Sequence, residues 1–196
     1  MMGALLDILG AIIIGGMLLM VLITFNFQLV QTANRNVYAA EMTDRMEAAS
    51  VRLNYLMGLV GVGMGTADKA VVGMDENKFV FNSCWNFADD SIGTTAYEYT
   101  LFYDAEANQN MGGAIVLRQG NNIVIEDMGY ILWVDGLKLK YYDMEDDETS
   151  TASEVRSVEL WISFSRAAPQ MDGKTLNNRL QLRCYMMNAY LQEGTS

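Results

Sequence analysis

The N-terminal part of the chain carries the strongest hydrophobic pattern in the sequence. No charged residue occurs between Ile8 and Asn34, and the run Ile8–Phe25 is almost wholly apolar. At about 1.5 Å per helical residue this run reaches roughly 27 Å, which is close to the hydrocarbon thickness of a bilayer. The pattern predicts an apolar helix that lies in a membrane or in a bundle of similar helices.

The helical pattern resumes beyond the apolar run without a Pro or Gly break. Six apolar residues recur at steps of four and three, which places them on one side of a helix; they are Met42, Met46, Ala49, Leu53, Leu56 and Val60. Four glycines then predict the helix end, because glycine disfavours the helix and supplies left-handed caps; they are Gly58, Gly61, Gly63 and Gly65. We predict one helix from about Leu5 to about Val62, apolar in its first half and amphipathic in its second.

From Lys78 onward the hydrophobic period changes from 3.6 to 2, which is typical of strands. The predicted strands are Lys78–Phe87, Thr95–Tyr103, Gly113–Arg118, Ile123–Asp127, Tyr130–Val134, Leu137–Tyr142, Glu154–Arg166 and Asn178–Tyr190. One long helix followed by a run of strands favours an α+β fold. We expect the amphipathic half of the helix to pack on an antiparallel sheet.

The strand Glu154–Arg166 alternates most cleanly between apolar and polar residues. Its apolar set is predicted to face inward: Val158, Leu160, Ile162 and Phe164. Its polar set is predicted to face outward: Ser157, Glu159, Ser163 and Ser165.

These patterns divide the chain into three parts. Residues 1–34 form the hydrophobic helix, residues 35–65 its amphipathic continuation, and residues 66–196 an antiparallel β domain. The part outside the hydrophobic helix is long enough to bury a core of its own.

Composition narrows the classes of function. The chain is 51% hydrophobic with a single proline, which excludes disorder, and its net charge is −11. Nucleic acid is therefore not an expected partner, because scattered basic residues among more numerous acids would not neutralise phosphates. The sequence contains no histidine, which removes the usual general base and the usual partner of a nucleophile. We expect no enzymatic activity.

Cys84 and Cys184 are the only two cysteines, and no CxxC motif is present. A redox or zinc site of usual spacing is therefore not predicted. Two alternatives remain: a disulfide that joins the first and last predicted strands, or two buried thiols that pack as small hydrophobic groups.

An acidic segment follows the predicted strand Leu137–Tyr142. Its oxygen-bearing residues fall at positions one, three, five, seven, nine and twelve of a twelve-residue loop, as in a calcium-binding loop; they are Asp143, Glu145, Asp147, Thr149, Thr151 and Glu154. Position six is Glu148 instead of glycine, and no helices flank the loop. The alternatives are a calcium site and a solvated acidic loop.

Small residues in the apolar helix permit the close approach of a second helix. They are Ala4, Gly10, Ala11, Gly15 and Gly16. Asp7 stands at the edge of the apolar run. A carboxylate there can lie at the level of the lipid headgroups, and the nearby helix N-terminus favours its negative charge.

A hydrophobic N-terminal helix with an amphipathic continuation and an antiparallel sheet resembles the type IV pilin-like family, which includes the pseudopilins of type II secretion. The segments 115–143 (IVLRQGNNIVIEDMGYILWVDGLKLKYYD), 155–165 (VRSVELWISFS) and 179–188 (RLQLRCYMMN) are similar to the strand pattern of the larger minor pseudopilins. The resemblance covers most of the chain, through loose patterns of apolar residues.

The resemblance implies a structural subunit of an extracellular filament that assembles through its hydrophobic helix with copies of itself or related subunits. Such a subunit lies in the inner membrane before assembly and in a cell-surface filament afterwards. The family carries a glutamate at its fifth mature position, which pairs with a neighbour's N-terminal ammonium; Asp7 takes this place if the mature chain begins at Gly3. No basic residue precedes the apolar run and the helix has no proline, so processing stays open. The alternative is a membrane-anchored extracytoplasmic binding or sensor domain that never polymerises.

Overall fold

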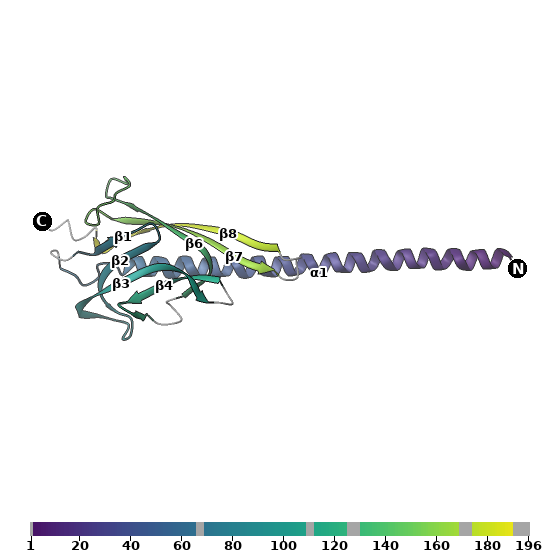
Figure 1. Cartoon of the computed structure of the whole chain (residues 1–196), viewed down its shortest axis with the longest axis horizontal. Helices are drawn as coiled ribbons and strands as arrows, with labels where there is room; N and C mark the ends of the chain where they lie inside the picture. Colours follow the sequence, from purple (N-terminus) through teal and green to yellow (C-terminus); the bar gives the residue numbers. More distant parts are fainter. Residues whose placement is uncertain (1, 66–68, 109–111, 125–129, 169–173, 190–196) are drawn as a thin grey trace. The chain divides into compact units, whose positions relative to one another are not determined.

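The computed structural model describes residues 2–65, 69–108, 112–124, 130–168 and 174–189. The chain begins with the helix α1 (Met2–Gly58), and strands follow it (Figure 1). They are β1 (Val71–Met74), β2 (Lys78–Asn86), β3 (Ser91–Asn108), β4 (Gly112–Gln119), β5 (Asn122–Ile123), β6 (Tyr130–Tyr142), β7 (Ser157–Ala168) and β8 (Lys174–Tyr185). The predicted α+β class is confirmed.

The chain divides into two compact units, which are described separately. The first contains Met1–Glu41 and Ala167–Lys174, and the second contains Met42–Arg166 and Thr175–Ser196. The sequence places a boundary at residue 34, whereas the contacts place it between Glu41 and Met42. The buried helical stripe begins at Met42, which is why the second unit begins there.

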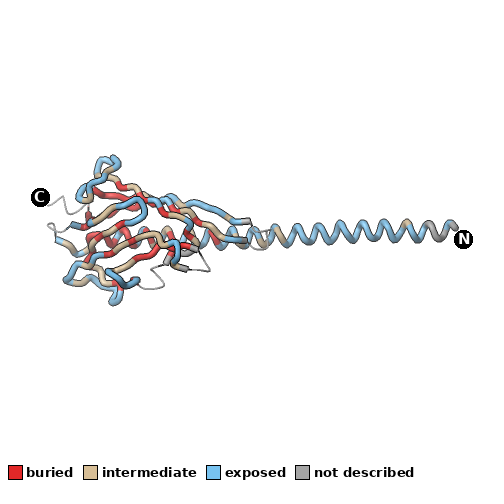
Figure 2. Tube along the Cα trace, viewed as in Figure 1, coloured by how far each residue is buried: buried red, intermediate tan, exposed pale blue. Residues whose placement is uncertain are grey.

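In the first unit, the apolar part of α1 is uncovered. Every large apolar side chain from Ile8 to Val30 has at least 51% of its surface exposed. Figure 2 shows this part of the helix almost wholly in the colour of exposed residues. Nothing among the described residues of the first unit buries this surface.

In the second unit, the predicted stripe of α1 packs on the sheet. Five of its six residues are buried and Met46 is half-buried, and all belong to one core with strand residues such as Phe79, Phe81 and Tyr99. The period of 3.6 in the helix therefore identified the covered face correctly.

Helix α1 ends at Gly58, four residues earlier than predicted. Gly61 (φ 74°) and Gly63 (φ 71°) adopt the left-handed conformation that glycine permits. A Cβ added at Gly63 would lie 2.9 Å from the Cβ of Cys84, so only glycine fits there. Hydrogen bonds from Gly61 N to Asn82 O (2.9 Å) and from Cys84 N to Val62 O (2.8 Å) attach this segment to β2.

The strands of the described residues form one eight-stranded sheet in the order β1-β2-β3-β4-β6-β7-β8, with β5 paired to β4. The pairs with a recorded register, from β1–β2 through β6–β7, are antiparallel.

Two predicted strands, Tyr130–Val134 and Leu137–Tyr142, are one strand, β6, whose pairing shifts at irregularities on either side of Val134. Strand β1 was not predicted. In the predicted Ile123–Asp127 strand, residues 125–127 lie outside the described residues.

The alternation predicted for β7 is correct on its apolar face. Val158, Leu160, Ile162 and Phe164 are all buried. The outward prediction for Ser157 is wrong, because this residue is fully buried. Its hydroxyl oxygen accepts hydrogen bonds from Arg183 Nε (3.2 Å) and Nη2 (3.1 Å), so a polar partner satisfies it inside the fold.

Candidate assembly segment and acidic loop

The predicted assembly residues lie on the exposed part of α1. Asp7 and Ala11 are exposed. A Cβ added at Gly10, Gly15 or Gly16 would meet no atom within 4 Å beyond the helix itself. These small residues therefore leave a helix surface that is open to lipid or to a second helix.

The same segment meets the requirements of a membrane span. Among the described residues, α1 is the one helix that is long and apolar enough, by length and composition, to cross a membrane, and none of its most apolar window is buried in the chain. A core helix of a soluble protein would pass the same test while being mostly buried. This helix has its apolar residues outside.

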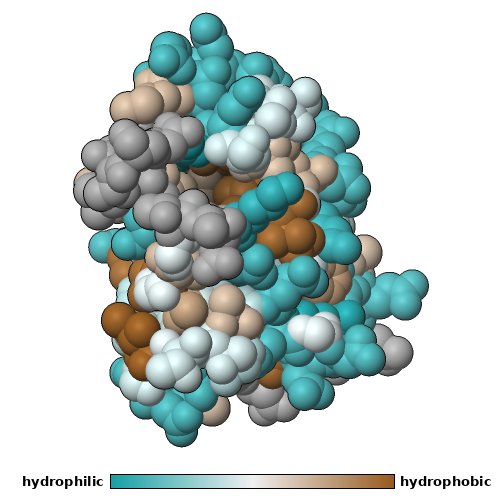
Figure 3. Space-filling view, turned by 90° about the vertical axis from the view of Figure 1, so that its left-hand side faces the viewer, coloured by the Kyte–Doolittle hydropathy of each residue, from teal (hydrophilic) through white to brown (hydrophobic). Residues whose placement is uncertain are grey.

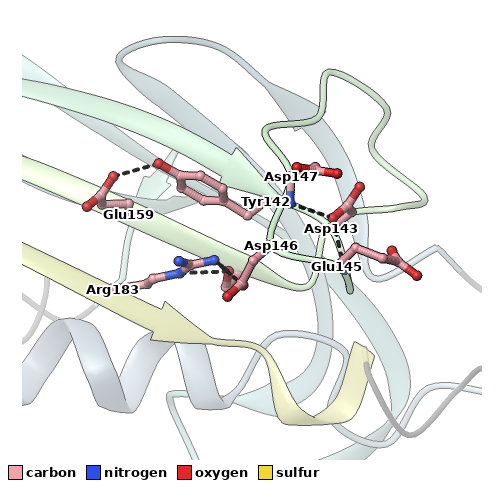
Figure 4. Close-up of polar contacts among 8 residues, drawn as sticks. Tyr142, Asp143, Glu145, Asp146, Asp147, Glu159 and Arg183 are labelled. Atoms are coloured by element: carbon pink, nitrogen blue, oxygen red, sulfur yellow. Dashed lines mark hydrogen bonds and ion pairs between the residues drawn. The ribbon is translucent and has the colours of Figure 1, made fainter.

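The second candidate site is the acidic loop, defined as residues 143–154 between β6 and β7 (Figure 4). Asp143 organises its first half, since its Oδ1 accepts hydrogen bonds from Glu145 N (3.0 Å) and Asp147 N (2.9 Å). Thr149 Oγ1 donates to Glu154 Oε2 (2.9 Å) in the second half. The two bonds to Asp143 are local side-chain to backbone turns of the kind that Asp forms, whereas the Thr149–Glu154 bond joins two side chains of the loop.

Arg183 on β8 attaches the acidic loop to the sheet. Its guanidinium forms an ion pair with Asp146, donates to Ser157 Oγ, and lies over the ring of Tyr142 at 4.3 Å from the centroid (Figure 4). Asp146 has φ 69°, which aspartate tolerates better than most residues. Local sequence patterns do not predict this contact. The alternation of β8 could place Arg183 on the outer face, but its pairing with Asp146 depends on the order of strands.

Next to this contact, Glu159 connects three strands. It accepts hydrogen bonds from Gln181 Nε2 on β8 (2.6 Å) and from the Tyr142 hydroxyl on β6 (2.8 Å). The hydrogen bond from Gln181 is the main cause that lowers the pKa of Glu159, and the bond to Glu159 is the main cause that raises the pKa of Tyr142. Glu159 therefore stabilises the fold above its ordinary pKa, and this contribution is lost as the pH falls through its lowered pKa.

The carboxylates predicted to bind calcium do not converge. The described residues include no group of three or more His, Cys, Asp or Glu side chains that could hold a metal ion. Asp143 and Glu154 accept hydrogen bonds from within the loop itself, and Glu145, Asp147 and Glu154 are exposed. The arrangement favours the solvated acidic loop over the calcium site.

Cys84 and Cys184 are two separate buried thiols. The disulfide alternative is therefore not what the structure contains. Cys84 Sγ lies 3.4 Å from Gly63 O, and Cys184 Sγ lies 3.3 Å from Asn54 Oδ1. Burial raises the pKa of Cys184 from 9.0 to about 12. Because the folded state holds this proton more tightly, the contribution of Cys184 to stability is full below pH 9 and is lost as the pH rises toward 12.

We expect both thiols to react with a thiol reagent only after unfolding. Their burial denies access to the reagent, and the raised pKa of Cys184 leaves little reactive thiolate at pH 8. Titration should count close to zero thiols in the native protein and two in the denatured protein, without added reductant. A melting temperature that falls when reductant is added would contradict the free-thiol state.

We expect Arg183→Ala to release the acidic loop and to lower the free energy of unfolding by about 1–2 kcal/mol, because charge-assisted hydrogen bonds are lost and Ser157 stays buried without its donor. Arg179→Ala is the matched control, since Arg179 is an exposed arginine on the same strand. Limited proteolysis within residues 143–154 measures the release. Equal cleavage of the two variants would show that Arg183 does not hold the loop.

Comparisons with models of protein families, with curated proteins and with solved structures find no match to this chain.

Proposed function

We propose that the protein is a structural subunit of a type IV pilus-like or pseudopilus-like extracellular filament, which assembles through its hydrophobic N-terminal helix. One observation supports this function above the others. The apolar side chains from Ile8 to Val30 point outward all around α1, and the described fold buries none of them. An exposed apolar surface of this extent requires a partner, which is lipid before assembly and neighbouring helices afterwards.

The charge of the chain supports the helix as the place of assembly. The net charge is −11, so copies of the chain repel each other at long range. The face drawn in Figure 3 is largely hydrophilic, with hydrophobic residues at separate places. Strong short-range contacts between copies are therefore expected from α1 instead of from this face. The partners are copies of this chain or related subunits, first in the inner membrane and then in a cell-surface filament.

A groove favours the second candidate function, a membrane-anchored extracytoplasmic binding or sensor domain. It has a volume of about 390 Å³ and is lined by residues 74–76, 138–141 and 148–150. Two ion pairs lie along it, Lys138–Glu76 (2.6 Å) and Lys140–Glu148 (2.9 Å). The basic groups of the groove are thus engaged by the chain itself, which leaves the filament subunit as the better supported function.

Asp7 provides the experiment that tests the proposed function. In a filament core with little water, an unpaired carboxylate would be penalised, so Asp7 is proposed to pair with the N-terminal ammonium of a neighbouring subunit. Asp7→Ala should leave the protein folded and inserted in the membrane while it reduces filament formation. Asp7→Glu should largely restore filaments. Filament yield is measured by electron microscopy and by the amount of protein in the sheared surface fraction.

The matched control is Ile8→Val, which changes the neighbouring exposed position without altering charge. If Asp7→Ala filaments form at the normal rate and with the same helical rise, Asp7 has no role in assembly and lies at the level of the lipid headgroups.

A further inference from the structure

The polar residues that follow the apolar run are not alike in their hydrogen bonding. Thr24 Oγ1 donates to Met20 O (2.8 Å), and Asn26 Nδ2 donates to Leu22 O (3.0 Å). Each side chain is thus bonded to a carbonyl one turn earlier in its own helix. By contrast, none of the described hydrogen bonds involves the side chains of Gln28 or Gln31.

This difference matters in a medium without water. The main cost of a polar side chain in hydrocarbon comes from unmet hydrogen bonds. A threonine hydroxyl that bonds to the carbonyl four residues earlier has its donor satisfied without any partner. Asn26 has one of its amide hydrogens satisfied in the same way, whereas the amide of Gln28 has neither hydrogen satisfied. Thr24 and Asn26 are therefore compatible with hydrocarbon, and Gln28 is the first residue that needs water.

The exposed apolar surface continues over the same interval. Phe25 and Phe27 have 56% and 63% of their surfaces exposed. A helix from Ile8 to Phe27 reaches about 30 Å at about 1.5 Å per residue, which equals the hydrocarbon thickness of a typical bilayer. A helix that stopped at Phe25 would fall about 3 Å short of this thickness and would leave Phe27 in water.

We infer that the lipid-embedded segment of α1 runs from Ile8 to Phe27, with Thr24 and Asn26 inside the hydrocarbon and Gln28 at the boundary with water. The inference rests on the membrane stage of the proposed function. Its partner at this stage is lipid, because the Thr24 hydroxyl and one Asn26 amide hydrogen already bond to their own helix and do not need a second copy as acceptor.

The test uses the full chain in phosphatidylcholine vesicles at a low ratio of protein to lipid. The probe is an environment-sensitive fluorophore attached to one introduced cysteine, in Leu22→Cys, Phe27→Cys or Gln31→Cys. The unsubstituted chain is the labelling control, because Cys84 and Cys184 are buried. Blue-shifted emission that is quenched by nitroxide-bearing lipids is expected at positions 22 and 27, and water-like emission without quenching at position 31.

Water-like emission at position 27 with apolar emission at position 22 would overturn the inference and leave membrane insertion intact. Water-like emission at both positions would overturn insertion itself, and with it the membrane stage of the proposed function. Blue-shifted emission at position 27 without quenching by lipid would show that a second copy covers the helix there, which also overturns the inference.

A charge scan provides a second measurement on the same vesicles. Asn26→Asp should lower the vesicle-bound fraction at least tenfold, because it places a charge in the hydrocarbon. Thr32→Asp is the matched control, because Thr32 makes the same bond to the carbonyl four residues earlier, Gln28 O (2.9 Å), but lies beyond the boundary. It should change binding less than twofold. Equal effects of the two substitutions would place the boundary elsewhere.

Discussion

A shortened chain that begins at Asn34 is expected to be a soluble monomer. It lacks the uncovered apolar segment from Ile8 to Val30 but keeps the whole second unit from Met42 onward, with the helical stripe already covered by the sheet. The full chain, in contrast, should require detergent or lipid. Size-exclusion chromatography of both chains without detergent measures this difference.

A chain that begins at Met17 is the matched control for the shortened chain. It keeps the apolar residues from Met17 to Val30 and should still form large particles, because the exposed hydrophobic surface persists. Large oligomers of the chain that begins at Asn34 would mean that the β domain itself carries the assembly interface.

Leu53→Ala is expected to lower the free energy of unfolding by about 2–5 kcal/mol, because it leaves a cavity in a close-packed core. Leu53 is fully buried between α1 and the sheet, whereas Val51, two residues earlier, has 65% of its surface exposed. Val51→Ala is therefore the matched control and should change the free energy by less than about 0.5 kcal/mol. Urea unfolding of the shortened chain measures both values.

Equal and small effects of the two substitutions, both below about 0.5 kcal/mol, would contradict the packing of α1 on the sheet. Large effects of both substitutions would instead show that a further surface covers the outer face of the helix in the shortened chain.

The sequence predicted the elements whose signal is local. The stripe from Met42 to Val60 follows from helical periodicity alone, and the inward face of β7 follows from alternation. Strand β1 escaped prediction because its four residues (VVGM) are too few for a period and include a glycine. Between the predicted strands Tyr130–Val134 and Leu137–Tyr142, Asp135 and Gly136 form an irregularity within β6, where the pairing with β7 shifts between Val134 and Gly136.

The contacts of the candidate sites depend on distant segments, and these the sequence could not supply. Ser157 was expected outside because it is polar, but it is buried with Arg183, a partner on another strand. Two cysteines a hundred positions apart are equally compatible with a disulfide and with two thiols until the fold places their neighbours. The spacing of Asp143 to Glu154 matched a calcium loop, yet the Asp143 and Glu154 carboxylates accept hydrogen bonds from within the loop, and the described residues include no group of three or more such side chains that could hold a metal ion.

The bonds of Thr24 and Asn26 to their own helix could have been predicted from the sequence. Threonine and asparagine within a helix often bond to the carbonyl four residues earlier, and both lie in a strongly predicted helix. Polarity alone ends the apolar run at Phe25. The bonding state of each polar side chain, as well as its polarity, determines where such a segment ends.

The central proposal is assembly into a filament through the hydrophobic helix. Its most direct test is electron microscopy of material sheared from the surface of cells that produce the full chain, with an antibody against the shortened chain as the label. Labelled helical filaments are expected, with the β domain outside and α1 packed in the core. Label confined to intact membranes, with no filament in the sheared material, would contradict filament assembly and support a membrane-anchored domain that does not polymerise.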